Sequence, residues 1–139
     1  MAQLVREIMT SDITMVEPQT SVVEVARLMR EQDIGAVVVA ENGRLRGLVT
    51  DRDLVVRALA DGGSVDDRTV YSACSAELVS VAPDDDVDRA VYLMGARAVR
   101  RMLVVEDGRL VGIVSLGDVA VARDADSALG DISAADPNH

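Results

Sequence analysis

The sequence predicts an α+β fold made of two copies of one β-α-β-β-α unit. Three observations predict it. The chain repeats itself without a gap, each copy carries a tight two-residue turn between apolar runs, and segments with helical spacing of apolar residues flank each turn. The chain has 139 residues, 49% of them hydrophobic, which is enough for one compact domain or two very small ones.

The repeat is the strongest feature of the sequence. Gly47 and Gly112 lie 65 residues apart (112 − 47), and the same offset aligns Pro18 with Pro83. No gap is needed to match residues 5–60 to residues 70–125. Unrelated segments do not stay aligned by chance over that length, so the two halves are copies of one duplicated unit.

The first two elements of each copy follow from local patterns. A short apolar segment that ends at a proline predicts a strand, at residues 13–16 and 78–81. The next segment predicts a helix, which opens with the capping box Ser21–Glu24 in copy one and with aspartates 84–86 in copy two. The predicted buried faces of these helices comprise Val22, Val25, Leu28 and Met29, and Val87, Ala90, Val91 and Met94.

A buried hairpin and a second helix complete each copy. The apolar runs 36–40 and 102–105 predict strands that return through Asn42-Gly43 and Asp107-Gly108, both strong turn signals. Second helices are predicted at 51–60 and 117–124. We expect one repeat in residues 1–62 and the other in 63–125, followed by an acidic, disordered tail at 126–139.

Composition excludes several classes of function. Asp and Glu number 24 against 14 basic residues, and a net charge of −10 disfavours nucleic acid and anionic membranes as partners. The single cysteine, Cys74, excludes a disulfide framework and indicates a reducing compartment. Because the N-terminal segment has charges where a signal peptide is apolar, we expect a cytoplasmic protein. One cysteine and His139 alone predict no tight metal site.

The ends of the two copies carry a family resemblance. Copy one contains Asp33-Ile34-Gly35-Ala36 and then Gly47-Leu48-Val49-Thr50-Asp51-Arg52-Asp53; copy two ends in Gly112-Ile113-Val114-Ser115-Leu116-Gly117-Asp118. A tandem β-α-β-β-α unit ending in Gly-hydrophobic-Val-Thr/Ser-x-x-Asp resembles the pair of CBS (cystathionine β-synthase-type) domains called the Bateman module. The resemblance covers residues 4 to 125 and extends to small bacterial proteins that consist of little else.

The resemblance implies a regulatory module. Members pack their two copies through the sheets about a pseudo-twofold axis, and the cleft holds two related sites. Many bind AMP, ADP or ATP there, fewer bind S-adenosylmethionine, and modules commonly associate into flat homodimers. None of these implied ligands is a required cofactor, and any protein partner of this chain is unknown.

Two strand-to-helix junctions are the candidate phosphate- and ribose-binding segments. Thr50 and Asp53 in copy one correspond to Ser115 and Asp118 in copy two. A helix N-terminus with a hydroxyl favours a phosphate, and an ionised aspartate accepts ribose hydroxyls. The same Thr/Ser-x-x-Asp pattern is also close to a capping box that stabilises a helix without any ligand. Both interpretations stay open.

Three further residues make the two junctions unequal. Arg100 and Arg101 precede the buried strand of copy two, where a guanidinium suits a phosphate, although surface salt bridges explain them as well. Copy one has Gly35 and Ala36 there. Gly117 leaves the backbone of copy two open to a ligand, whereas copy one has Arg52, which would contact a phosphate or form a solvated ion pair.

The resemblance also implies where adenine would lie. It would place Arg100, Arg101, Ser115 and Asp118 opposite an adenine-binding wall of copy one, and Thr50, Arg52 and Asp53 opposite a wall of copy two. The wall residues are Thr14, Ile34, Gly35 and Ala36 in copy one, and Val79 and Val99 in copy two.

Three functional classes follow. The first is a sensor that binds an adenosine nucleotide and changes conformation or dimer geometry. The second is a ligand-free structural or interaction module that acts through dimerisation. An enzyme is the weakest class, because the sequence contains no nucleophile–base–orienter set, metal cluster or P-loop.

Overall fold

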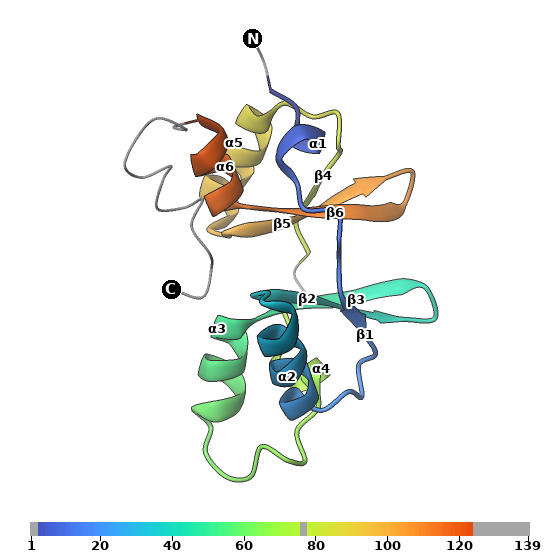
Figure 1. The fold of residues 1–139 in the computed structure, drawn as a ribbon, viewed down its shortest axis with the longest axis vertical. Coiled ribbons are helices and arrows are strands. Elements are labelled where there is room, and N and C mark those ends of the chain that lie inside the picture. Colours follow the sequence, from blue (N-terminus) through green and yellow to red (C-terminus); the bar gives the residue numbers. More distant parts are fainter. Residues whose placement is uncertain (1–2, 76–77, 124–139) are drawn as a thin grey trace. The chain divides into compact units, whose positions relative to one another are not determined.

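The computed structural model describes residues 3–75 and 78–123 and divides the chain into two compact units. Of the described residues, unit 2 comprises 14–75 and 78, whereas unit 1 joins residues 3–13 with residues 79–123. Each unit consists of a three-stranded sheet with its helices on one face (Figure 1). The structure is therefore α+β, as the sequence predicts.

Unit 2 contains the sheet β1-β2-β3, in which β2 pairs parallel to β1 and antiparallel to β3. Its elements in chain order are β1 (Met15–Val16), α2 (Val22–Gln32), β2 (Ala36–Glu41), β3 (Arg44–Thr50), α3 (Asp51–Asp53), the π-helix η1 (Leu54–Leu59) and α4 (Val70–Ala73). Asn42 and Gly43 have φ values of 53° and 78°, which confirms the predicted hairpin turn, since both central residues need positive φ.

Unit 1 has the same topology in the sheet β4-β5-β6. Its elements are α1 (Val5–Ile8), β4 (Ser80–Val81), α5 (Val87–Arg97), β5 (Arg101–Glu106), β6 (Arg109–Ser115) and α6 (Leu116–Arg123). The two hairpins even share an irregularity, since the register shifts between Val39 and Ala40 in one and between Val104 and Val105 in the other. The duplication seen in the sequence is thus a duplication of structure.

Each unit has its own apolar core beneath the sheet. The buried side chains of unit 2 include Val22, Val25, Met29, Val37, Val39, Val49 and Ala58. Those of unit 1 include Val81, Val87, Ala90, Met94, Met102, Val104 and Val114. The predicted helical faces are confirmed except for Val91, which is exposed, and Leu28, which is only half-buried. In α5 the core residues are Val87, Ala90 and Met94, whereas Val91 is 38% exposed.

The first helices begin at the predicted residues but use simpler caps. The Ser21 hydroxyl accepts a 3.1 Å hydrogen bond from the Glu24 backbone N–H, while the Glu24 carboxylate lies 3.9 Å from Arg27. Only half of the predicted capping box is therefore formed. In α5 the cap is Asp86, whose side chain accepts from the Asp88 N–H.

Two four-residue helices, α1 and α4, were not predicted. Their first residues, Val5 and Val70, are fully buried, and the backbone N–H groups of these residues bond to the carbonyls of Asp85 and Thr20 at 2.9 and 2.7 Å. The segment before the first strand of each copy therefore packs in the unit that the other copy builds. The compact units consequently divide the chain differently from the sequence repeats, and the tail 126–139 lies outside the described residues.

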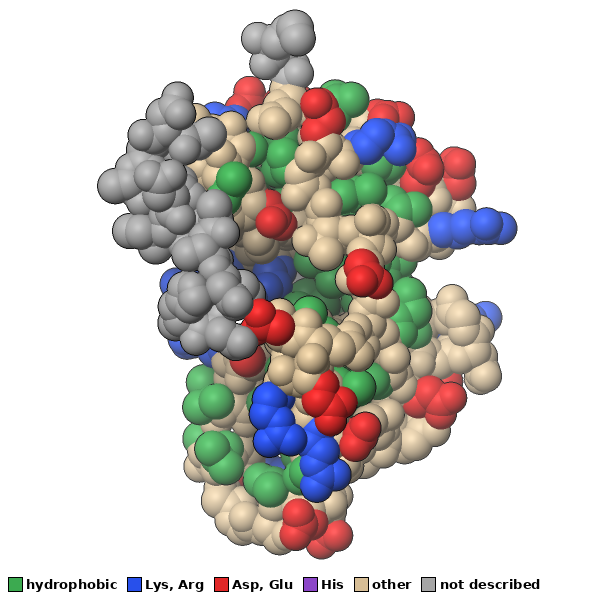
Figure 2. All heavy atoms as spheres, viewed as in Figure 1, with side chains coloured by type: hydrophobic (Ala, Val, Ile, Leu, Met, Phe, Trp, Pro, Cys, Tyr) green, Lys and Arg blue, Asp and Glu red, His purple; other side chains and the backbone are tan. Residues whose placement is uncertain are grey.

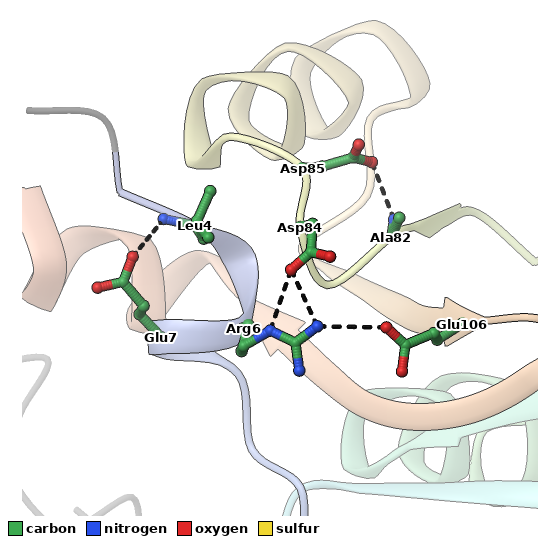
Figure 3. Close-up of polar contacts among 7 residues, drawn as sticks. All are labelled: Leu4, Arg6, Glu7, Ala82, Asp84, Asp85 and Glu106. Atoms are coloured by element: carbon green, nitrogen blue, oxygen red, sulfur yellow. Dashed lines mark hydrogen bonds and ion pairs between the residues drawn. The ribbon is translucent and has the colours of Figure 1, made fainter.

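An ion-pair cluster reinforces α1 in unit 1 (Figure 3). The Arg6 guanidinium donates to Asp84 at 2.9 and 3.1 Å and to Glu106 at 3.2 Å. The hydrogen bond and the charge of Asp84 raise the pKa of Arg6 above its ordinary value. Because all three side chains are well exposed, the cluster adds little stability and chiefly fixes where α1 lies.

The second helix of copy one differs from the predicted continuous helix over 51–60. Only Asp51–Asp53 is α-helical, and Leu54–Leu59 continues as a π-helix in which the Ala60 N–H bonds to the Val55 carbonyl at 3.0 Å. The corresponding segment of copy two is a regular α-helix of eight residues. Within the described ranges no helix has the length and apolar character that crossing a membrane requires.

Candidate functional site

In unit 1 the end of β6 and the start of α6 form a closed hydrogen-bonded turn. The Asp118 N–H donates to the Ser115 hydroxyl at 3.1 Å, and the Ser115 N–H donates to Oδ2 of Asp118 at 2.8 Å. This is the reciprocal capping pattern that the sequence suggested. It holds the Asp118 carboxylate at the N-terminus of an eight-residue helix, where the helix dipole favours anions.

The same turn brings the two arginines beside Ser115. Arg101 pairs with Ser115 across β5 and β6, and the Leu116 N–H bonds to the Arg100 carbonyl at 2.8 Å. In the part of the chain that the structure describes, neither guanidinium takes part in an ion pair. The backbone thus places Arg100 and Arg101 beside the Ser115–Asp118 turn at one end of the sheet.

Gly117 leaves room for a methyl group in this turn. A Cβ built on Gly117 would have the Ser115 hydroxyl as its nearest neighbour, at 3.6 Å, which is an ordinary contact. Val79 and Val99 belong to the same end of unit 1, since the Val79 carbonyl accepts from the Leu103 N–H and Val99 follows α5 directly. We call Val79, Val99, Arg100, Arg101, Ser115, Gly117 and Asp118 the unit 1 cluster.

Unit 2 carries the matching arrangement. The Thr50 hydroxyl accepts from the Asp53 N–H at 3.1 Å, and Oδ2 of Asp53 accepts from the Thr50 N–H at 2.9 Å. The Asp51 N–H bonds to the Gly35 carbonyl at 3.0 Å, as its counterpart does in unit 1. The unit 2 cluster comprises Thr14, Ile34, Gly35, Ala36, Thr50, Arg52 and Asp53.

The two wall residues of unit 2 that flank the sheet are also placed by its backbone. The Thr14 carbonyl accepts from the Val38 N–H, and Ile34 follows α2, whose Met29 carbonyl accepts its N–H. The Thr14 hydroxyl itself bonds to the Gln32 side chain. Within each unit, the wall residues and that unit's own junction thus belong to one sheet and its flanking segments, whereas the resemblance would set each wall opposite the junction of the other copy.

The two aspartates differ in one contact that sequence reasoning missed. Oδ1 of Asp53 lies 3.7 Å from Nε of Arg57, whereas the position equivalent to Arg57 in copy two is Ala122. Within the described residues no ion pair to Asp118 is formed. The spacing Asp53–Arg57 is that of an i,i+4 helical ion pair, which could have indicated this contact from the sequence.

The other titratable and metal-binding candidates do not add chemistry. Burial raises the pKa of the Cys74 thiol, and the charge of Asp53 raises it further. Cys74, the C-cap residue of α4, is buried in the core of unit 2. Residues 3–75 and 78–123 contain no group of three or more side chains suited to a metal ion.

A model of the CBS domain matches the chain twice, over residues 5–59 and 70–124. The chain belongs to the CBS domain family. The two matches start 65 residues apart (70 − 5), the same offset as the sequence repeat, so each CBS domain corresponds to one copy. The resemblance that rested on the Gly47–Asp53 and Gly112–Asp118 stretches is confirmed. CBS domains are in general regulatory modules.

The chain is similar to several known proteins with CBS domains. The CBS domain-containing protein YhcV of Bacillus subtilis is 40% identical over 134 residues, which is 93% of this chain and 94% of YhcV. A putative signal-transduction protein with CBS domains from Burkholderia ambifaria has a TM-score of 0.83 at 27% identity, covering 90% of this chain and 96% of its own. The hexameric CBS-CP12 protein of bloom-forming cyanobacteria has a TM-score of 0.82 at 26% identity, covering 89% and 70% of the two chains.

Proposed function

We propose that the chain is a non-catalytic regulatory module that binds an adenosine nucleotide, AMP, ADP or ATP, and responds through conformational change and homodimerisation. One observation carries the proposal: the unit 1 cluster places Arg100 and Arg101 beside the Ser115–Asp118 turn. The family assignment supports the regulatory role, and the hexameric assembly of the CBS-CP12 protein supports self-association.

Each part of a nucleotide has a chemically suited group in this cluster. Guanidinium groups bind phosphate through paired N–H donors, and the α6 N-terminus adds N–H groups of the same polarity. Oδ1 of Asp118 can accept hydrogen bonds from ribose hydroxyls while Oδ2 keeps its bond to Ser115. The resemblance would set the wall of copy one opposite these groups, and we depart from it here. The partly buried Val99 of unit 1 offers the apolar surface for an adenine ring, since Val79 is 8% exposed and belongs to the core.

Unit 2 is the weaker candidate in this proposal. Arg57 forms an ion pair with Oδ1 of Asp53 at 3.7 Å, and Gly35 and Ala36 stand where copy two has the arginines. We therefore assign the nucleotide to unit 1.

A ligand-free structural module is the second candidate. It is favoured by the capping bonds, since Thr50–Asp53 and Ser115–Asp118 are both satisfied without any ligand. This alternative explains the caps, but it leaves Arg100 and Arg101 of unit 1 without a role.

A thermal-shift screen separates the two candidates. We expect AMP, ADP or ATP to raise the melting temperature, because a ligand present at about 100 times its Kd adds about 2.7 kcal/mol of stability. NAD and S-adenosylmethionine serve as comparison ligands that share the adenosine moiety. Identical melting temperatures with and without every one of these compounds would leave the ligand-free module as the function.

A further inference from the structure

The second helix of unit 2 differs in type from its counterpart in unit 1. Leu54–Leu59 is a π-helix, in which the Ala60 N–H bonds to the carbonyl of Val55, five residues back. Leu116–Arg123, which follows the corresponding junction of unit 1, is an α-helix. A π-helix is rare, usually interrupts an α-helix for a single turn, and often marks a functional site.

Neither the length nor the composition of this segment imposes the π form. The two copies match without a gap through residue 60, so the segment contains no residue that copy two lacks. Residues 51–60 also contain no glycine and no proline, the two residues that disfavour an α-helix most. After the same reciprocal cap, the equivalent residues of copy two form an α-helix. The segment of copy one can therefore adopt an α form as well.

The π and α forms turn different side chains toward the core. Val56 on η1 is 51% exposed, whereas Val121, the same residue type at the equivalent position of α6, is half-buried. Leu54 is only partly buried, whereas its equivalent Val119 is 4% exposed. Figure 2 shows hydrophobic side chains at the surface over η1, with basic side chains beside them. The π form thus leaves in water apolar surface that the α form of unit 1 buries.

An apolar groove beside η1 gives these side chains a place to go. The groove lies between α2 and η1, has a volume of about 350 Å³, and is lined by apolar residues apart from Asp51. Leu54 and Leu59 line it from η1, and Leu59 is 61% exposed. Because removing apolar surface from water is favourable, turning these two leucines into the groove stabilises the α form and offsets the loss of the π hydrogen bonds.

The chain on either side of η1 suits such a transition. The Thr50–Asp53 cap holds the start of the helix through two hydrogen bonds. Beyond the other end lie Gly62 and Gly63, with φ values of 73° and 71°, and a Cβ built on either would have no atom within 4 Å. Two successive glycines in open space adopt other backbone angles at little cost. Arg68 donates to the Gly62 carbonyl at 2.9 Å, an exposed contact that its long side chain can follow.

We propose that residues 54–59 form a conformational switch between the π-helix described above and an α-helix like that of unit 1. In the α form Leu54 and Leu59 lie in the groove, and the apolar surface over η1 is reduced. Arg57 lies on the switch and pairs with Asp53 at 3.7 Å, which links the helix type to the Thr50–Asp53 junction. A molecule that binds one form better shifts the balance toward it. The inference goes beyond the proposed function and does not depend on nucleotide binding in unit 1.

NMR relaxation dispersion of the backbone amides of the whole chain tests the switch, because shifts of helix register occur in microseconds to milliseconds. We expect exchange at residues 54–61 with a minor form populated at about 0.1–10%. Residues 119–123 of α6 are the internal control and should show no such exchange. The Cα chemical shifts of the minor form should stay helical, since both forms are helices, whereas unwinding of the segment would move them toward coil values.

A groove-filling variant tests where the side chains go. Ala26→Leu fills the groove from α2. We expect the exchange at residues 54–61 to fall at least about threefold, because a close-packed groove leaves the leucines of η1 no space. Ala96→Leu makes the same substitution at an exposed position of α5 and should leave the exchange unchanged.

Four results would overturn the switch. They are flat dispersion profiles at residues 54–61 of the wild type, a minor form with coil shifts, undiminished exchange in Ala26→Leu, and an equal reduction in Ala96→Leu. Circular dichroism establishes that each variant keeps its fold. If Ala26→Leu does not fold, the profiles and minor-form shifts of the wild type still decide the question.

Discussion

Gly112→Ala is expected to lower the free energy of unfolding by about 1–3 kcal/mol, the range for overpacking a tight site. A Cβ built on Gly112 would lie 2.6 Å from Met9 Sδ and 3.0 Å from the Thr10 carbonyl oxygen. The thioether can swing away, but the carbonyl cannot, because it accepts a 2.9 Å hydrogen bond from the Ile113 N–H. The methyl group therefore strains the bridge that ties the segment after α1 to β6.

Gly95→Ala is the matched control for this prediction. Gly95 lies inside α5, and a Cβ built on it would have no atom within 4 Å, so alanine should stabilise the helix by about 0.5–1 kcal/mol. Urea unfolding of the two variants measures both effects. If Gly112→Ala were as stable as the wild type, the close approach of the α1 segment to β6 would be wrong.

Asp118→Ala is expected to weaken nucleotide binding at least about tenfold, since a hydrogen bond to a charged group contributes about 1.5–3 kcal/mol. The variant also removes the helix cap, which costs about 1 kcal/mol of stability. Asp53→Ala removes the corresponding cap of unit 2 and hence controls for that cost. Calorimetric titration with the nucleotide that gives the largest thermal shift should show nearly unchanged affinity for Asp53→Ala. If Asp53→Ala weakened nucleotide binding more than Asp118→Ala, the site would have to be assigned to unit 2.

The elements that the sequence predicted well are those set by local chemistry. The hairpins at Asn42-Gly43 and Asp107-Gly108 follow from residues that tolerate positive φ, and the 65-residue register fixes the second copy once the first is assigned. The four-residue helices α1 and α4 could not be predicted in this way. Helices of four residues are not stable by intrinsic propensity. The stability of α1 and α4 comes from the burial of Val5 and Val70.

The same distinction holds for the candidate site: features set by local chemistry were predicted, and the others were not. The Thr/Ser-x-x-Asp turns form as predicted because residues three apart at a helix start meet through local hydrogen bonds. The π-helix at Leu54–Leu59 follows from no simple local pattern, whereas the pairing of Arg57 with Asp53 was missed although its i,i+4 spacing indicates it. The π-helix and the Arg57–Asp53 pair make the two copies differ more than Arg100 and Arg101 alone suggested.

The number of nucleotides that one chain binds tests the assignment to unit 1 most directly. Isothermal titration calorimetry of the wild type should give a single tight site per chain, and the double variant Arg100→Gln/Arg101→Gln should lose it while keeping its fold. Two sites of equal affinity, or a single site that the double variant retains in full, would contradict the assignment of the nucleotide to the unit 1 cluster.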